Sequence, residues 1–160
     1  MKVDSFSLIN YTLSMRYTTK TEYGLVALLY MARKPEGSCV TVKEIAGAEH
    51  YSITYIEKIF QKLRLAEIVK AYHGNEGGYV LARNPSEITL KQVIDALEGQ
   101  TFDVFCKAEV REEIVCTHLS ICALSPIWSK TKQTLDDLYE SITLEMIAGS
   151  GKKPAPAVSA

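Results

Sequence analysis

The chain has 160 residues, of which 47% are hydrophobic and 23% charged, so it is long enough to bury a core of its own. No apolar run approaches the roughly 18 uncharged residues of a membrane-spanning helix, and residues 1–14 lack the apolar region of a secretory signal, so we expect a cytoplasmic protein without a membrane partner. The net charge is -1, but residues 15–83 hold ten Lys and Arg against seven Asp and Glu, whereas residues 84–160 hold seven against eleven. The local charge of each half is therefore more informative than the sum.

Two helices are predicted at the start of the folded region. Apolar residues recur at helical spacing over 19–34, and basic residues at the C-terminal end of this stretch suit the helix dipole. After a connection with Pro and Gly, Thr41 and Glu44 have the spacing of a capping box, in which each side chain satisfies a free amide at a helix start. A short helix at 42–48 follows from this signal.

The next segment predicts a helix and then a hairpin. Ser52 is a suitable N-cap for a helix at 53–66, whose apolar residues lie on one face. Two helices joined by a short turn have the form of a helix-turn-helix. Short strands are predicted at 68–72 and 79–82, and the glycines between them favour a hairpin turn. A hairpin directly after a helix-turn-helix is a wing.

The second half predicts two further helices. Thr89 and Gln92 form another capping box, which opens a helix that ends near Leu97. Ser125 as N-cap, followed by Pro126, predicts a long amphipathic helix at 126–141. Its apolar stripe recurs at spacings of three and four, at Trp128, Thr131, Leu135, Leu138 and Ile142. A chain this short offers little surface for that stripe, so we expect it to pair with the same helix of a second subunit.

The predicted fold class is mostly α with a small β-hairpin wing, that is, a winged helix-turn-helix followed by a long C-terminal dimerisation helix. The predicted organisation is an N-terminal extension at 1–14, a DNA-binding domain at 15–84, a cysteine loop with dimerisation helices at 85–148, and a disordered tail at 149–160.

Three of the four cysteines lie in one weakly periodic segment, 99–124, which suggests a loop organised by something other than an apolar face. Cys106, Cys116 and Cys122 are a plausible set of thiolate ligands for an iron-sulfur cluster or zinc. The alternative is that they are small buried hydrophobic residues. Disulfides are not expected in a cytoplasmic chain with a core of this size, and Cys39 is interpreted as a packing residue.

The predicted recognition helix carries polar residues outside its apolar stripe. Such side chains can hold phosphates or bond to base edges, although every surface helix also has a solvated face. The candidates are Ser52, Thr54, Tyr55, Glu57, Lys58, Gln61 and Lys62. Further candidates are Arg16, Thr18 and Lys20, which would touch backbone phosphates, and His73 and Asn75, which would enter the minor groove.

The order of these parts resembles the Rrf2 family of bacterial transcription regulators, the group that includes iron-sulfur and nitric-oxide sensors. The resemblance covers nearly everything from residue 15 to residue 148. The matching stretches are MRYTTKTEYGLVALLYMA (15–32), SITYIEKIFQKLRLAEIVKAY (52–72), GNEGGYVLAR (74–83), ITLKQVIDALEG (88–99), the cysteine segment and the long helix to EMIA.

The resemblance implies an iron-sulfur cluster on Cys106, Cys116 and Cys122, with [2Fe-2S] favoured over [4Fe-4S] and zinc third. For the fourth ligand it points to Glu22, from where a carboxylate reaches the partner's cluster in some members, and His118 lies within the loop. The chain also departs from the family pattern. The interval from Cys106 to Cys116 is longer than in cluster-binding members, Ser125 stands where they have a histidine ligand, and His73 stands where they have a wing arginine.

We therefore expect a homodimeric repressor that binds a palindromic operator and whose DNA affinity is set by the cluster, in response to iron-sulfur status, nitric oxide or redox state. One alternative is a cluster-free regulator of the same family that responds to thiols or a small molecule. Another is an electron-transfer protein that does not bind DNA. Catalysis is not expected, because the sequence has no nucleophile-base grouping and no nucleotide-binding fingerprint.

Overall fold

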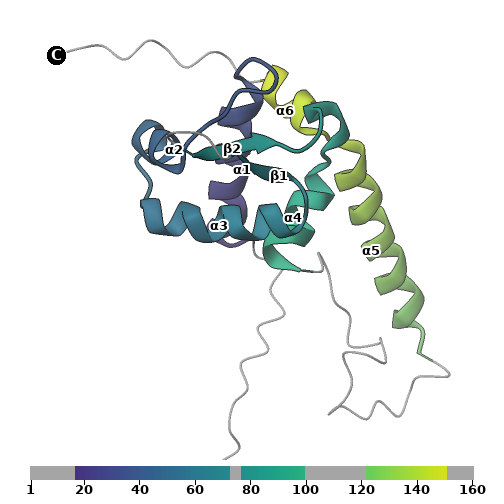
Figure 1. Cartoon of the computed structure of the whole chain (residues 1–160). Coiled ribbons are helices and arrows are strands. Elements are labelled where there is room, and N and C mark those ends of the chain that lie inside the picture. The colour runs from purple at the N-terminus through teal and green to yellow at the C-terminus, as the bar shows by residue number, and fades with distance from the viewer. Residues whose placement is uncertain (1–16, 73–76, 100–121, 151–160) are drawn as a thin grey trace, which may run out of the picture.

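The computed structural model of the chain describes residues 17–72, 77–99 and 122–150. Helices arranged around a two-stranded sheet form the body of the molecule, and a long helix runs along its side (Figure 1). The elements in chain order are α1 (Thr19–Ala32), α2 (Val42–Glu49), α3 (Ile53–Leu65), β1 (Val69–Tyr72), β2 (Gly78–Leu81), the 3₁₀ turn η1 (Pro85–Glu87), α4 (Leu90–Glu98), α5 (Leu124–Ser141) and α6 (Leu144–Ser150). The mostly helical fold class with a small hairpin is confirmed.

The helix-turn-helix consists of α2 and α3. The Thr41 hydroxyl caps α2 by accepting from the Glu44 amide at 3.0 Å, which is one half of the predicted capping box. The Glu44 carboxylate does not complete the box, because it accepts from the Tyr30 hydroxyl of α1 at 2.8 Å and pairs with Lys34, just after α1, at 2.9 Å. The turn passes through His50, whose φ of 57° is left-handed and ends α2. Capping and the α1 contact together fix the first helix of the motif.

The wing is an antiparallel hairpin in which Val69 pairs with Leu81 and Tyr72 with Gly78. Its second strand is also bridged to the connection before α2, because the Val40 and Tyr79 backbones exchange hydrogen bonds of 2.9 and 2.8 Å. This bridge makes the hairpin part of the body rather than a free arm. The connection at the wing tip, residues 73–76, lies outside the described residues.

The core lies between α1, α3, the hairpin and α4. α3 contributes the face that its sequence period predicts, with Ile56, Ile59, Phe60 and Leu63 all buried. Gly24 of α1 allows close approach to α4, since a Cβ at that position would lie 2.4 Å from Leu97 Cδ1. The first helix and α4 therefore pack more closely than ordinary side chains permit.

The C-terminal helices differ from the sequence prediction. α5 begins at Leu124, and its N-cap is Ala123, so the prediction that Ser125 caps the helix is wrong. Pro126 still lies in the first turn, where its missing N–H costs nothing. α5 ends at Ser141, as predicted, but Ile142, which was predicted to continue its apolar stripe, lies outside the helix in an extended conformation.

The chain leaves the helix at Ile142 because residues 142–144 form backbone hydrogen bonds with residues 88–90, which are distant in sequence. The Leu90 amide donates to the Ile142 carbonyl at 2.8 Å, and the Leu144 amide donates to the Ile88 carbonyl at 2.9 Å. This short bridge stops α5 and turns the chain into α6, which places Leu144 in the core with an exposed fraction of 0%.

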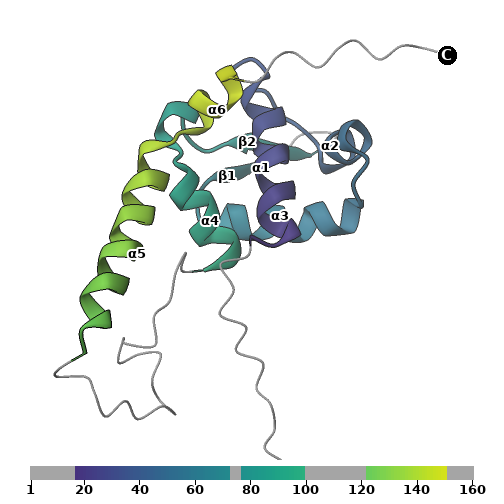
Figure 2. The same ribbon diagram turned by 180° about the vertical axis from the view of Figure 1, so that it is seen from behind.

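α5 crosses the outside of α4 and extends beyond the body in both views (Figures 1 and 2). None of its residues is buried. A polar contact joins it to the body, because Lys91 of α4 lies 3.9 Å from Asp136 of α5. Lys91 also pairs with Asp95 of its own helix. Tyr17 also reaches α5, through a hydroxyl-hydroxyl hydrogen bond to Tyr139. Nowhere in the three described ranges is there a helix with the length and hydropathy to cross a membrane.

Candidate DNA-binding surface and cysteine ligands

The outer face of α3 is polar and open to solvent. Its buried face fills the core, and most of the residues between the apolar positions are exposed. The sequence-predicted contacts that are exposed here are Ser52, Thr54, Glu57, Lys58, Gln61 and Lys62. Ser52 precedes α3 as its N-cap residue, but its hydroxyl makes no capping hydrogen bond. These residues lie together on one face of the second helix of the motif, and they stay predicted DNA contacts.

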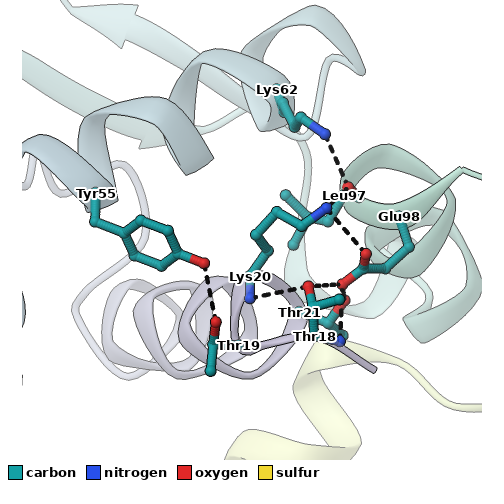
Figure 3. A network of polar contacts seen from close by, with 8 residues as sticks. All are labelled: Thr18, Thr19, Lys20, Thr21, Tyr55, Lys62, Leu97 and Glu98. Atoms are coloured by element: carbon teal, nitrogen blue, oxygen red, sulfur yellow. Dashed lines mark hydrogen bonds and ion pairs between the residues drawn. The ribbon is translucent and has the colours of Figure 1, made fainter. Parts of the chain in front are cut away.

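Tyr55 lies differently from its neighbours on α3. It is half-buried, and its ring packs edge-on against Tyr23 of α1 with centroids 5.6 Å apart. Its hydroxyl lies 3.1 Å from the Thr19 hydroxyl (Figure 3). Tyr23 in turn stacks on Tyr51, with centroids 4.0 Å apart. Part of the Tyr55 side chain therefore fixes the start of α1 beside α3.

The start of α1 is held by the last residue of α4 (Figure 3). Thr18 is the N-cap of α1, and its amide donates to Glu98 Oε1 at 3.1 Å. The Thr18 hydroxyl also donates to this oxygen. The Thr21 hydroxyl donates to the same oxygen at 2.8 Å, and Lys20 Nζ lies 3.0 Å from Glu98 Oε2. The carboxylate thus binds one amide, two hydroxyls and one ammonium group of α1.

These contacts change the protonation of Glu98. Partial burial raises the pKa of the carboxyl group, but the hydrogen bonds from Thr18, Thr21 and Lys20 outweigh it and lower the pKa to about 2. The carboxylate is therefore ionised at every pH at which the protein is expected to fold and function.

A second lysine reaches the same place from α3. Lys62 Nζ donates to the Leu97 carbonyl at 3.0 Å, and Lys20 Nζ donates to that carbonyl at 3.4 Å. Two ammonium groups thus meet at the C-terminal end of α4, where the helix dipole favours positive charge. Three predicted DNA contacts, Thr18, Lys20 and Lys62, are joined through two residues of α4.

Glu98 and the Leu97 carbonyl were not among the site residues predicted from the sequence. One signal was available, because an acidic residue in the last turn of a helix opposes the dipole unless a cation lies nearby. The sequence does not say which cation, since Lys20 and Lys62 lie 77 and 35 positions away from Leu97.

At the wing, Arg83 joins the hairpin to α4 by donating to Gln92 Oε1 at 3.2 Å and to the Glu87 carbonyl at 3.4 Å. The predicted minor-groove contacts His73 and Asn75 lie outside the described residues, as does the predicted phosphate contact Arg16.

Most of the predicted metal ligands also lie outside the described residues, namely Cys106, Cys116 and His118. Cys122 is half-buried and comes two residues before the start of α5. Glu22 is exposed in the first turn of α1. Among the residues that the structure describes, no three His, Cys, Asp or Glu side chains are grouped as a metal site.

Cys39 is exposed and belongs to the connection before α2. Its Sγ lies against Gly78 of β2, at a point only 2.5 Å from where a Cβ of residue 78 would stand. Because the side chain touches the wing but is exposed, the packing role of Cys39 stays an interpretation.

Comparison with known proteins gives one consistent family. The model of the Rrf2 family, described as an iron-dependent transcriptional regulator, matches residues 17–150. The HTH-type transcriptional regulator CymR of Bacillus subtilis is 32% identical over 134 residues, covering 84% of this chain and 90% of CymR. IscR of Pectobacterium atrosepticum is 28% identical over 136 residues, covering 85% of this chain and 80% of IscR.

Solved structures give the same picture. The structure of B. subtilis CymR, described as the global cysteine regulator of that organism, has a TM-score of 0.64 at 30% identity and covers 86% of this chain and 98% of CymR. The structure of T. potens IscR has a TM-score of 0.65 at 28% identity and covers 90% of this chain and 93% of IscR. The chain therefore belongs to the Rrf2 family of DNA-binding, winged-helix transcriptional regulators.

Proposed function

We propose that this regulator is a homodimeric, cytoplasmic repressor that binds a palindromic operator and whose affinity for the operator depends on an iron-sulfur cluster held by cysteines. The observation that carries the DNA-binding half is the exposed polar face of α3. Lys62 of this helix and Lys20 at the start of α1 meet at the Leu97 carbonyl, at the end of α4. A face of this kind suits the major groove, with the wing beside it on the duplex.

The long helix supports the dimer. α5 has 18 residues, none of them buried by the rest of the chain. Its large apolar residues Leu124, Ile127, Trp128 and Leu138 are 40–56% exposed. A row of apolar side chains on a helix favours burial against a second helix, and a two-fold pair of copies would present two α3 helices to two half-sites.

The chemistry of the donor set supports the cluster. Cys106, Cys116 and Cys122 are soft thiolate ligands between α4 and α5, and Cys122 is half-buried directly before α5. When bound, a cluster would supply sensitivity to iron supply, nitric oxide or oxidants. The protein's own part is to hold the thiolates, with Glu22 or His118 as candidate fourth ligands. The resemblance stated above implies [2Fe-2S] rather than [4Fe-4S], and this preference stays part of the proposal.

A second candidate is a cluster-free regulator that responds to thiols or a small molecule. The resemblance to CymR, which is described as a global cysteine regulator, favours this alternative. The long interval between Cys106 and Cys116 favours it too.

The deciding experiment is purification without oxygen, followed by an absorption spectrum and counts of iron and sulfide. For the cluster we expect visible absorption that Cys116→Ala and Cys122→Ala each abolish, together with a change in operator affinity in the same direction. Cys39→Ala is the matched control and should change neither. Iron-free wild-type protein that still binds its operator would favour the cluster-free alternative.

A further inference from the structure

The ammonium group of Lys20 is held inside the protein's own polar network rather than left open to solvent. It lies 3.0 Å from Glu98 Oε2 and 3.4 Å from the Leu97 carbonyl (Figure 3). The Lys20 side chain is 35% exposed and that of Glu98 15%. A lysine of this kind is close enough to the surface to bind a ligand but already has a charged partner.

Lys20 also lies at the border of the surface that we assign to DNA. Thr19, its neighbour in the chain, contacts Tyr55 in the first half of α3, and Lys62 in the second half of α3 donates to the same Leu97 carbonyl as Lys20. The start of α1 therefore contacts α3 directly through Thr19 and Tyr55, and indirectly through the α4 carbonyl that Lys20 and Lys62 share. A duplex lying along α3 would bring a backbone phosphate near Lys20.

We propose that Glu98 is an affinity-determining residue that restrains Lys20 from binding a DNA backbone phosphate. This inference rests on the proposed DNA-binding function. A phosphate that approaches Lys20 must compete with the Glu98 carboxylate for the ammonium group, and the two anions also repel each other. Glu98 therefore lowers the affinity for any duplex, whatever its sequence.

The restraint is permanent over the working pH range, because the Glu98 carboxylate stays ionised. Glu98 also lies next to the segment that holds the predicted cysteine ligands. Glu98 is the last residue of α4, and the sequence continues from Gly99 toward Cys106 and Cys116.

Glu98→Gln is the variant that tests this. Its amide oxygen can still accept from Thr18 and Thr21, but the side chain no longer carries the charge that holds Lys20. The probe is double-stranded DNA of mixed sequence, titrated at several salt concentrations. We expect Glu98→Gln to bind about two- to fivefold more tightly at low salt, the range that an exposed ion pair allows. The slope of log K against log salt should steepen by up to about 1, because one more lysine neutralises a phosphate.

Two further variants identify the cause. In a Lys20→Gln background, Glu98→Gln should give little or no gain, since the released cation is missing. Glu36→Gln is the matched control, because it removes the same charge from the exposed connection at the other end of α1, roughly 20 Å away along the 14-residue helix. It should leave the affinity nearly unchanged. If Glu98→Gln folds poorly by circular dichroism, Glu98→Asp draws the carboxylate back by one methylene, and a smaller gain that depends on Lys20 is expected.

An unchanged or weaker affinity of Glu98→Gln would overturn the inference, and so would a gain that persists in the Lys20→Gln background. In both cases the wild-type protein would still bind DNA, and the proposed function would stand. Failure of the wild-type protein to bind any duplex at low salt would instead overturn the proposed function.

Discussion

Replacing Gly24 by alanine tests how closely α1 and α4 are packed. A Cβ at residue 24 would lie 2.4 Å from Leu97 Cδ1 and 3.4 Å from Ile59 Cγ2. The first distance is too short for two carbon atoms, so the fully buried Leu97 side chain must move. The same packing brings Glu98 to the start of α1, so the change would disturb the polar network as well as the core.

The expected cost can be worked from two opposing effects. Forcing an extra methyl group into a packed core costs about 1–3 kcal/mol. Alanine in place of glycine in a helix returns about 1 kcal/mol. We therefore expect Gly24→Ala to lower the free energy of unfolding by about 1 kcal/mol, within a net range of about 0–2 kcal/mol.

Urea unfolding followed by circular dichroism measures this, and Gly47→Ala is the matched control. Gly47 is also helical, in α2, but a Cβ there would meet nothing within 4 Å, so that variant should be up to about 1 kcal/mol more stable. Leu97→Ala should cost about 2–5 kcal/mol. In that background Gly24→Ala should become neutral or stabilising, because the clashing methyl group is gone. Additive effects of the two substitutions would refute the packing argument.

Three further predictions concern the DNA-binding surface, the long helix and the polar network. Gln61→Ala should relax base preference by about 1–3 kcal/mol at one position of the operator. Lys62→Ala should instead weaken binding to all sequences and lower the slope of log K against log salt by about 1. Titrations on operator and mixed DNA measure both effects, and equal behaviour of the two variants would contradict the assignment. Leu138→Asp should dissociate the dimer in sedimentation experiments, because it would bury a charge at the proposed interface, whereas Gln133→Asp on the same helix should not. Glu98 has a folded pKa of about 2, below its ordinary value of 4.5, so its stabilisation is present above pH 4.5 and is lost as pH falls toward 2. Acid titration should therefore destabilise wild-type protein more than Glu98→Gln.

The helix-turn-helix and its wing could be predicted from the sequence because their signals are local. The apolar period of α3 alone selects Ile56, Ile59, Phe60 and Leu63 for the core, and all four are buried. The capping signal at Thr41 locates the start of α2, and the glycines after β1 favour a hairpin. In each case a few neighbouring residues contain the whole signal, since helix period, caps and turns act over a few positions.

The candidate site was only partly predictable. Its polar residues on α3 follow from the same period, but the Tyr55 ring packs on Tyr23, which no count of α3 positions reveals. The end of α5 at Ser141 was predicted, but the extended Ile142 and the helix α6 after it were not, because the pairing of Ile142 with Leu90 joins residues distant in sequence.

What the sequence by itself determined is therefore the set of elements as far as α5, the buried face of α3 and the polar face that suits DNA, whereas α6 was not predicted. Only the tertiary structure decided which helix ends lie next to each other. Glu98 and Lys20 are 78 positions apart, and they come together because Gly24 allows α1 to approach α4. Local patterns encode which face of a helix is buried, whereas the partner of that face depends on how all the helices pack at once.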